Sequence, residues 1–250
     1  MGNEFSKLQE ILLTILGGPN SASNTAFGET SVAENRAQVG WGPFSNLKPQ
    51  HVLTYPINGG SADVVGNFAR VQSGTAINGG CALRTRGYFS YNAGIGEIAR
   101  WTSLYTTPKA GNEQWIGPFD FDASTLAPLN GWAVGYKGLD FGFARFTDGA
   151  EAEFVLKEDW NMDRMEELDT TLGNVYQLKA QWLGFGSQVL SMESSDTGGV
   201  FKDAHMIDYA NRHEKTSVEY PSVPFSMVVR NTGNSTNMVL RSPSAYVASQ

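Results

Sequence analysis

The chain has 250 residues, of which 41% are apolar and 17% charged, and its formal net charge is −7. A chain of this length can bury a full-sized core, and its many glycine and aromatic residues favour short strands and tight turns over a helical bundle. The acidic balance argues against a nucleic-acid partner, because binding a phosphate backbone requires clustered Lys and Arg. We also expect no membrane partner, since no apolar run reaches the roughly 20 residues of a bilayer span.

The first predicted element is a short amphipathic helix over residues 4–16. Its apolar side chains recur every three or four residues, at Phe5, Leu8, Ile11, Leu12 and Ile15. A helix this short is marginal alone in water, so the apolar stripe must pack against something. Two interpretations stay open: a lid on the domain's own core, or an arm whose apolar residues form an assembly interface with another subunit. The predicted domains are a helical arm at 1–20 and a β-sandwich at 21–250.

The rest of the chain consists of extended segments separated by glycine-containing breaks about every ten residues. Strands are expected at 51–55, 63–71, 75–83, 84–91, 98–106, 114–119, 131–136, 139–145, 151–156, 224–230 and 237–241. This rhythm predicts an all-β fold, an antiparallel β-sandwich of the jelly-roll or concanavalin-like kind. The acidic, Met-rich residues 157–168 interrupt it and predict one inserted helix or helical turn.

Residues 174–211 show the clearest strand pattern and predict a β-meander. Apolar and polar residues alternate over 176–182, and turn residues at 184–186 and 194–199 separate two further strands. Because side chains on a strand alternate between its faces, one face of this meander should be buried and the other wet. The predicted core residues are Tyr176, Leu178, Trp182 and Leu190, with Trp182 at the centre of the buried face.

Two pairs of carboxylates are candidates for chemistry. Glu151 and Glu153 lie two apart on a predicted strand and would share a face, as the paired carboxylates of sandwich glycosidases do, but the third carboxylate of that class is missing. Asp120 and Asp122, followed by Ser124, could hold a hard cation. Most of the six tryptophans are core candidates, although an exposed one could stack on a sugar ring. A solvated strand face is the simpler interpretation of the Glu pair.

Other sequence patterns resemble functional motifs but lack the neighbouring residues that those motifs require. Residues 94–99 match a dinucleotide-binding glycine loop, yet a strand-like segment follows where a helix is required, so a hairpin turn is the better interpretation. His205 and His213 have no third ligand nearby, and Cys81 is the single cysteine. We therefore expect no metal, no cofactor and no catalytic centre.

Several short phrases, taken in order, resemble a family of tailed-phage virion structural proteins that also occurs in some giant viruses. They include RGYFSYNAGIG at 86–96, GNEQWIG at 111–117, GWAVGY at 131–136, QWLGFG at 181–186 and HMIDYAN at 205–211. The resemblance runs from about Phe27 to the end of the chain. It implies a β-sandwich module used in fibres, spikes or capsid decoration, located on the virion, and it carries over no catalytic residue.

The sequence therefore predicts a non-enzymatic virion structural protein, a capsid decoration or head-fibre component attached through its N-terminal arm. Its expected partners are other capsid or tail proteins and copies of itself, with a trimer expected by analogy with virion appendages. A phage adhesin that recognises host surface glycans is the alternative. A polysaccharide-cleaving sandwich enzyme based on Glu151 and Glu153 is the third hypothesis.

Overall fold

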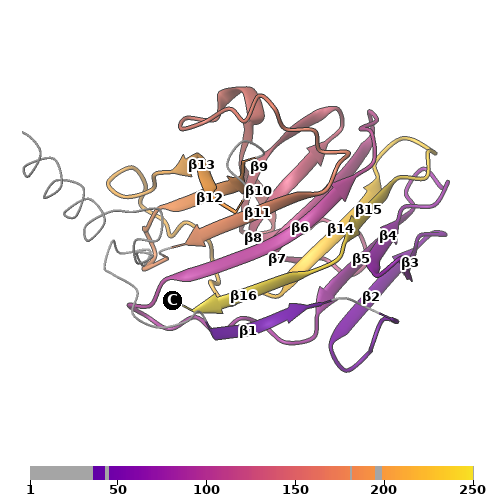
Figure 1. Cartoon of the computed structure of the whole chain (residues 1–250), viewed down its shortest axis with the longest axis horizontal. Helices are drawn as coiled ribbons and strands as arrows, with labels where there is room; N and C mark the ends of the chain where they lie inside the picture. Colours follow the sequence, from indigo (N-terminus) through magenta and orange to yellow (C-terminus); the bar gives the residue numbers. More distant parts are fainter. Residues whose placement is uncertain (1–35, 43–44, 181, 195–198, 250) are drawn as a thin grey trace, which may run out of the picture.

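The computed structural model describes residues 36–42, 45–180, 182–194 and 199–249 (Figure 1). The predicted arm, with Phe5, Leu8, Ile11, Leu12 and Ile15, and its boundary with the sandwich lie outside these residues. Within the described ranges the elements are β1 (Arg36–Trp41), β2 (Val52–Ile57), β3 (Ser61–Val65), β4 (Phe68–Gln72), β5 (Gly80–Thr85), β6 (Glu97–Tyr105), β7 (Asn112–Phe121), β8 (Pro128–Lys137), β9 (Asp140–Thr147), β10 (Ala150–Leu156), the 3-10 turn η1 (Lys157–Asp159), β11 (Asn174–Ala180), β12 (Gln188–Glu193), β13 (Phe201–Ile207), β14 (Phe225–Asn231), β15 (Val239–Ser242) and β16 (Ala245–Ser249).

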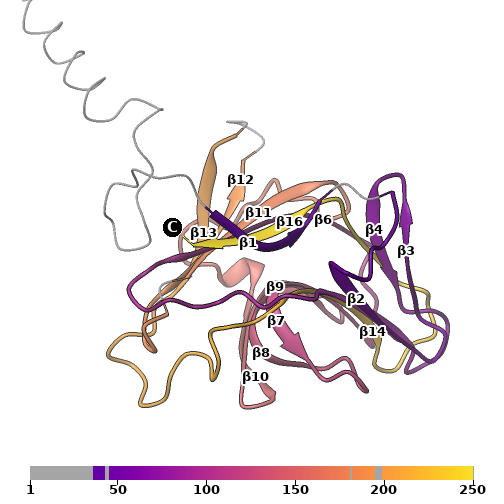
Figure 2. The same ribbon diagram turned by 90° about the horizontal axis from the view of Figure 1, so that it is seen from below.

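The strands form two antiparallel sheets that pack face to face, as Figure 2 shows from the side. One sheet has the order β13-β12-β11-β6-β15-β4-β3, with β16 and then β1 added beside β6. The other has the order β10-β9-β8-β7-β14-β5-β2. This arrangement confirms the predicted all-β antiparallel sandwich. No helix in the described ranges is long and apolar enough to cross a membrane.

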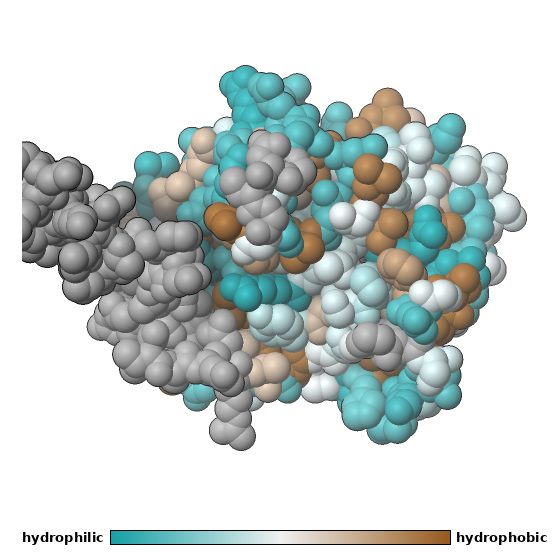
Figure 3. Space-filling view, in the orientation of Figure 1, coloured by the Kyte–Doolittle hydropathy of each residue, from teal (hydrophilic) through white to brown (hydrophobic). Residues whose placement is uncertain are grey.

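The predicted meander is confirmed, because β11, β12 and β13 pair in sequence order. It forms one flank of its sheet, whereas β6 lies at the junction and pairs with β11, β15 and β16. On the meander face that should be wet, Gln177 is 2% exposed, because Arg100 Nε of β6 donates to its Oε1 at 2.7 Å and the guanidinium lies 5.0 Å from the ring centre of Phe201. Figure 3 shows this side of the molecule, where hydrophobic residues lie in small separate groups among polar ones.

Of the helix or helical turn predicted at 157–168, only the single 3-10 turn η1 forms, followed by bends and turns, so a full helix there is wrong. The segment satisfies its backbone against the meander instead, since the N–H groups of Met162 and Asp163 both donate to Ala204 O on β13. Asn161 adds side-chain bonds to the backbone of Met206 in both directions. A helix would need these N–H groups for its own backbone hydrogen bonds. The tertiary contacts therefore override the local helix propensity.

The main core lies between the two sheets and is rich in aromatic residues. Trp101 on β6 stacks on Tyr176 on β11 with ring centres 5.6 Å apart, and it contacts Phe225 on β14 across the sandwich at 5.6 Å. Tyr176, Leu178 and Leu190 are all buried in this core. Trp182 lies just beyond the end of β11, where it is half-buried and packs edge-on against Tyr91 at 5.0 Å.

A second apolar cluster lies on the outer face of the seven-stranded sheet. Strand alternation places Ile116 towards the main core and the neighbouring Trp115 on the opposite face. Trp115 is 1% exposed because Phe146 and Phe154 pack edge-on against it, at 5.7 and 5.6 Å between ring centres. This sheet is therefore apolar on both faces along much of its length.

One buried carboxylate gives the fold a pH dependence. Glu97 points into the core with Ala99 and Trp101, and its Oε1 has no hydrogen-bond partner in the described part of the chain. Burial raises the pKa of Glu97 to about 8. Between the usual glutamate pKa of about 4.3 and this value, only the folded chain keeps the proton, so raising the pH through this window favours unfolding.

We therefore expect the free energy of unfolding to fall between pH 6 and pH 8, by at most about 1.4 kcal/mol per pH unit from this group. Glu97→Gln, which cannot ionise, should make that fall shallower in urea denaturation. Glu158→Gln, at an exposed site in η1, is the control and should keep the wild-type slope. An unchanged slope for Glu97→Gln would contradict the assignment.

Trp101 on β6 and Trp182 just beyond β11 should differ in their contribution to stability. Trp101→Ala removes a ring that is 2% exposed and should lower the free energy of unfolding by about 3–5 kcal/mol. Trp182→Ala should have a smaller effect, because Trp182 is only partly buried. Chemical denaturation of both variants checks the order, and a larger loss for Trp182→Ala would show that the end of β11 is the tighter part of the core.

Candidate functional site

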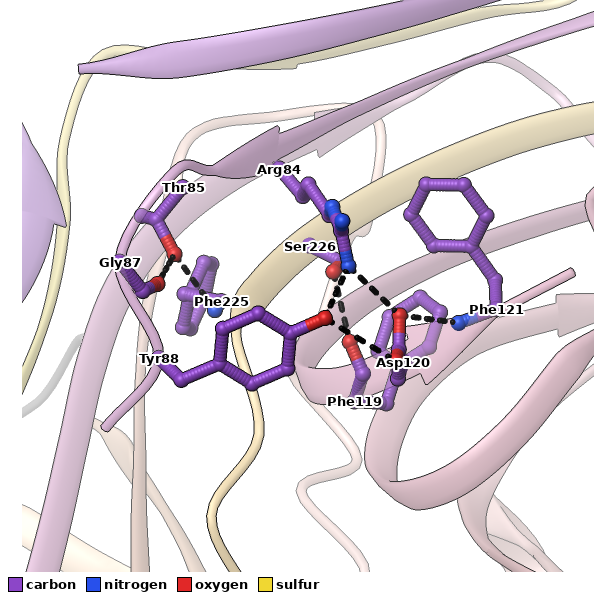
Figure 4. Close-up of polar contacts among 9 residues, drawn as sticks. All are labelled: Arg84, Thr85, Gly87, Tyr88, Phe119, Asp120, Phe121, Phe225 and Ser226. Atoms are coloured by element: carbon purple, nitrogen blue, oxygen red, sulfur yellow. Dashed lines mark hydrogen bonds and ion pairs between the residues drawn. The ribbon is translucent and has the colours of Figure 1, made fainter. Parts of the chain in front are cut away.

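Polar side chains from distant parts of the chain meet where β5 and β7 end (Figure 4). Arg84 Nη1 donates to Asp120 Oδ1 at 2.9 Å and to the Tyr88 hydroxyl at 2.7 Å. The Tyr88 hydroxyl in turn donates to Asp120 Oδ2 at 3.4 Å. The carboxylate is thus held by a cation and a phenol, and it retains acceptor capacity on Oδ2.

Aromatic rings fix the guanidinium that holds this carboxylate. The Arg84 guanidinium carbon lies 5.4 Å from the ring centre of Tyr55 and 5.3 Å from that of Tyr88, distances at which cation–π attraction operates. The turn that carries Tyr88 is fixed by Thr85, whose hydroxyl donates to Gly87 O at 2.7 Å and accepts from Phe225 N at 3.1 Å. Both the ring and the carboxylate are therefore pre-positioned.

The facing wall is the segment 215–223, which runs between β13 and β14. Asn130, at the start of β8 and 6% exposed, donates to Tyr220 O at 2.6 Å and accepts from Glu219 N at 2.9 Å. A buried amide that bonds both ways in this manner fixes the local backbone. Tyr220 is thereby held with its side chain 61% exposed.

These residues enclose a pocket of about 300 Å³, called the first pocket below, lined by Tyr88, Asp120, Leu129, Asn130, Gly149, Glu219, Tyr220, Ser222 and Val223. Its two tyrosines are the exposed ones, Tyr88 at 44% and Tyr220 at 61%. Aromatic rings offer apolar faces to sugar C–H groups, and carboxylates accept hydrogen bonds from sugar hydroxyls. The arrangement therefore suits a small polyhydroxylated ligand.

The structure separates the predicted glutamate pair. A register shift lies between the two residues, so Glu151 pairs with Phe146 of β9 and Glu153 pairs with the adjacent Arg145. Adjacent strand residues point to opposite faces, and the ion pairs agree, with Glu151 on Lys137 at 2.8 Å and Glu153 on Arg145 at 3.5 Å. The expectation of a shared face is wrong, because a bulge changes the parity that sequence spacing implies.

The predicted cation pair is also split. Asp120 binds Arg84, whereas Asp122 Oδ1 accepts from the backbone and hydroxyl groups of Ser124 and Thr125. These bonds, from the Ser124 hydroxyl foremost, lower the pKa of Asp122 to about 2. Asp122 therefore caps its own turn. In the described ranges no three His, Cys, Asp or Glu side chains gather in a way that could hold a metal ion.

His205, the glycine loop and the tryptophans, which are the remaining candidates from the sequence, have structural roles. His205 Nδ1 accepts from Asn161 N at 3.2 Å, and burial lowers the pKa of the imidazole. The glycine loop at 94–96 leads into strand β6, yet it is no hairpin, because β5 and β6 belong to different sheets. The tryptophans are buried or half-buried, so the exposed rings of the site are tyrosines that the sequence pattern did not single out.

No family model matches this chain. It is 26% identical over 132 residues to the DNA-binding transcriptional repressor ScoC of Bacillus subtilis (strain 168), a match that covers 52% of this chain and 63% of that protein. The chain thus spans less than two thirds of the length of this curated relative, and the match does not establish a shared family.

Similar solved structures are found among sandwiches at about 10% identity. The carbohydrate recognition domain of Emp47p has a TM-score of 0.53 over 87% of this chain and 98% of that one. The β-glucanase of Bacillus licheniformis has a TM-score of 0.54 at 10% identity over 88% and 100%. The CBM2 module of the evolved Dit protein of Lactobacillus casei BL23 phage J-1 has a TM-score of 0.52 at 10% identity over 86% and 96%. At such identities these likenesses show a shared fold, the two-sheet antiparallel β-sandwich.

Proposed function

We propose that this chain is a non-catalytic carbohydrate-binding module of a virion, which recognises host surface glycans through the first pocket. The observation that carries the proposal is the pairing of two exposed tyrosines, Tyr88 and Tyr220, around the fixed Asp120 carboxylate. Sugar rings stack on such faces while their hydroxyls bond to oriented polar groups. A carbohydrate-binding role also fits the fold shared with a carbohydrate recognition domain and a CBM2 module.

Binding is favoured over cleavage by the way the carboxylate is held. Asp120 Oδ1 already accepts from Arg84 and from Phe121 N, and Oδ2 accepts from Tyr88. A hydrolase needs one carboxyl group that delivers a proton to the leaving oxygen and a second that acts on the opposite side of the bond. Glu151 and Glu153, the other pair of neighbouring carboxylates, lie on opposite faces of β10.

The virion location is supported by the ordered phrases shared with tailed-phage structural proteins, and by the sandwich fold shared with a module of a phage Dit protein. In this proposal residues 1–20 attach the module to a capsid or tail protein or join its subunits, with a trimer as the assembly. The sandwich then presents its glycan pocket outward.

A glycan array tests the binding role. The wild-type chain should bind a defined set of sugars, and Tyr220→Ala or Tyr88→Ala should weaken binding about tenfold, equivalent to about 1.4 kcal/mol. Leu139→Ala is the matched control, because Leu139 is equally exposed at 63% but follows the opposite end of β8. Asn130→Ala should also weaken binding by releasing Tyr220. No binding to any sugar, or turnover of a polysaccharide, would contradict the proposal.

Antibody labelling tests the location. Purified particles of the virus that encodes the chain should contain it, and antibodies against the sandwich should label intact particles. Labelling that appears only after the particles are disrupted would place the chain inside and refute its role in surface recognition. The protein's absence from particles would refute the virion location while leaving the sugar-binding test unaffected.

A further inference from the structure

A second pocket lies next to the first. Its volume is about 410 Å³, and the two share Glu219 as a wall residue. The β9–β10 turn also spans both, since Gly149 lines the first and Asp148 the second. The full lining of the second pocket is Arg145, Thr147, Asp148, Ala152, Tyr209, Lys215, Thr216 and Glu219.

Hydrogen bonds and a cation–π contact fix the side chains at the base of the second pocket. Arg145, with its side chain 6% exposed, donates from Nη1 to Ser217 O at 2.6 Å, and its guanidinium carbon lies 4.9 Å from the ring centre of Tyr209. The Tyr209 hydroxyl donates to Thr216 O at 3.2 Å. Arg145 therefore holds the 215–217 part of the segment as Asn130 holds the 219–220 part, and one anchored stretch of backbone borders both pockets.

The charges of the second pocket balance locally. Lys215 Nζ lies 3.4 Å from Asp148 Oδ2, and Arg145 Nε lies 3.5 Å from Glu153 Oε2. A phosphate or carboxylate entering here would meet Asp148 and Glu219 as well as the cations. Sugar hydroxyls, by contrast, can donate to the carboxylates and accept from the cations without a net charge of their own. Threonine hydroxyls at Thr147 and Thr216 extend this polar lining.

We propose that the ligand is a neutral oligosaccharide of at least two linked sugars, with one unit in the first pocket and the next in the second, passing over Glu219. This inference rests on the proposed sugar-binding function. It adds that affinity depends on the length of the sugar chain as well as on a single ring, because both pockets border the same anchored segment. The first pocket supplies the aromatic faces, and the second supplies donors and acceptors.

The test is an array of glucose, mannose and N-acetylglucosamine, each printed as single sugars and as chains of up to about six units, with uronic acid chains beside them. Affinity should rise about tenfold or more from the single sugar to a short chain and then level off. Equal affinity for all lengths, or stronger binding of uronic acid chains, would overturn the inference.

A double variant assigns the gain to the second pocket. Asp148→Gly with Lys215→Met removes an exposed ion pair, which contributes little to stability, and glycine suits the positive φ of 53° at Asp148. It should reduce long-chain affinity to the single-sugar level and leave single-sugar affinity unchanged. Asp63→Ala with Arg70→Met removes an ion pair on β3 and β4 of the other sheet as the matched control.

The outcomes separate the two proposals. If the double variant keeps full long-chain affinity while Tyr220→Ala loses it, the second pocket is not a subsite and the sugar-binding function stands. If the wild-type chain binds no sugar of any length, the proposed function itself is wrong.

Discussion

Burial on both faces of the seven-stranded sheet constrains the rest of the molecule. Alternate residues of β7 point into the main core and into the outer aromatic cluster, so Ile116 and Trp115 are both almost fully buried. A sheet of this kind offers little open polar surface along its strands. The polar and exposed aromatic groups lie instead at the strand ends, where connecting segments supply them. The position of the first pocket at the ends of β5, β7 and β8 follows from this constraint.

Two buried side chains fix the conformation of the long segment between β13 and β14. Asn130 and Arg145 reach the segment 215–223 from neighbouring strands and bond to its backbone. Buried polar groups of this kind are costly to leave unpaired, so each bond strongly favours one loop conformation. Recognition residues are commonly carried on loops that a rigid scaffold positions. Here the scaffold is the sandwich and the positioned residues are Glu219 and Tyr220.

The same sandwich occurs in a carbohydrate recognition domain, a phage CBM2 module and a β-glucanase, so fold alone does not distinguish binding from hydrolysis. The proposal of a binding role rests instead on local geometry. One bulge in β10 turns Glu151 and Glu153 to opposite faces, and one guanidinium between Tyr55 and Tyr88 commits Asp120 to a fixed orientation. The proposed function, in which a ligand is held by stacking and hydrogen bonding, rests on these details.

Local pattern alone determined the all-β class, the positions of most strands and the β11–β13 meander, because strand alternation and turn residues act over only a few neighbours. It could not determine the segment 157–168, whose backbone bonds to a strand some forty residues later in the chain, nor the bulge that separates the two glutamates. The site depended even more on tertiary structure. Asn130 bonds to Glu219 and Arg84 to Asp120 across 89 and 36 residues, and such contacts arise only after the sheets have paired and packed.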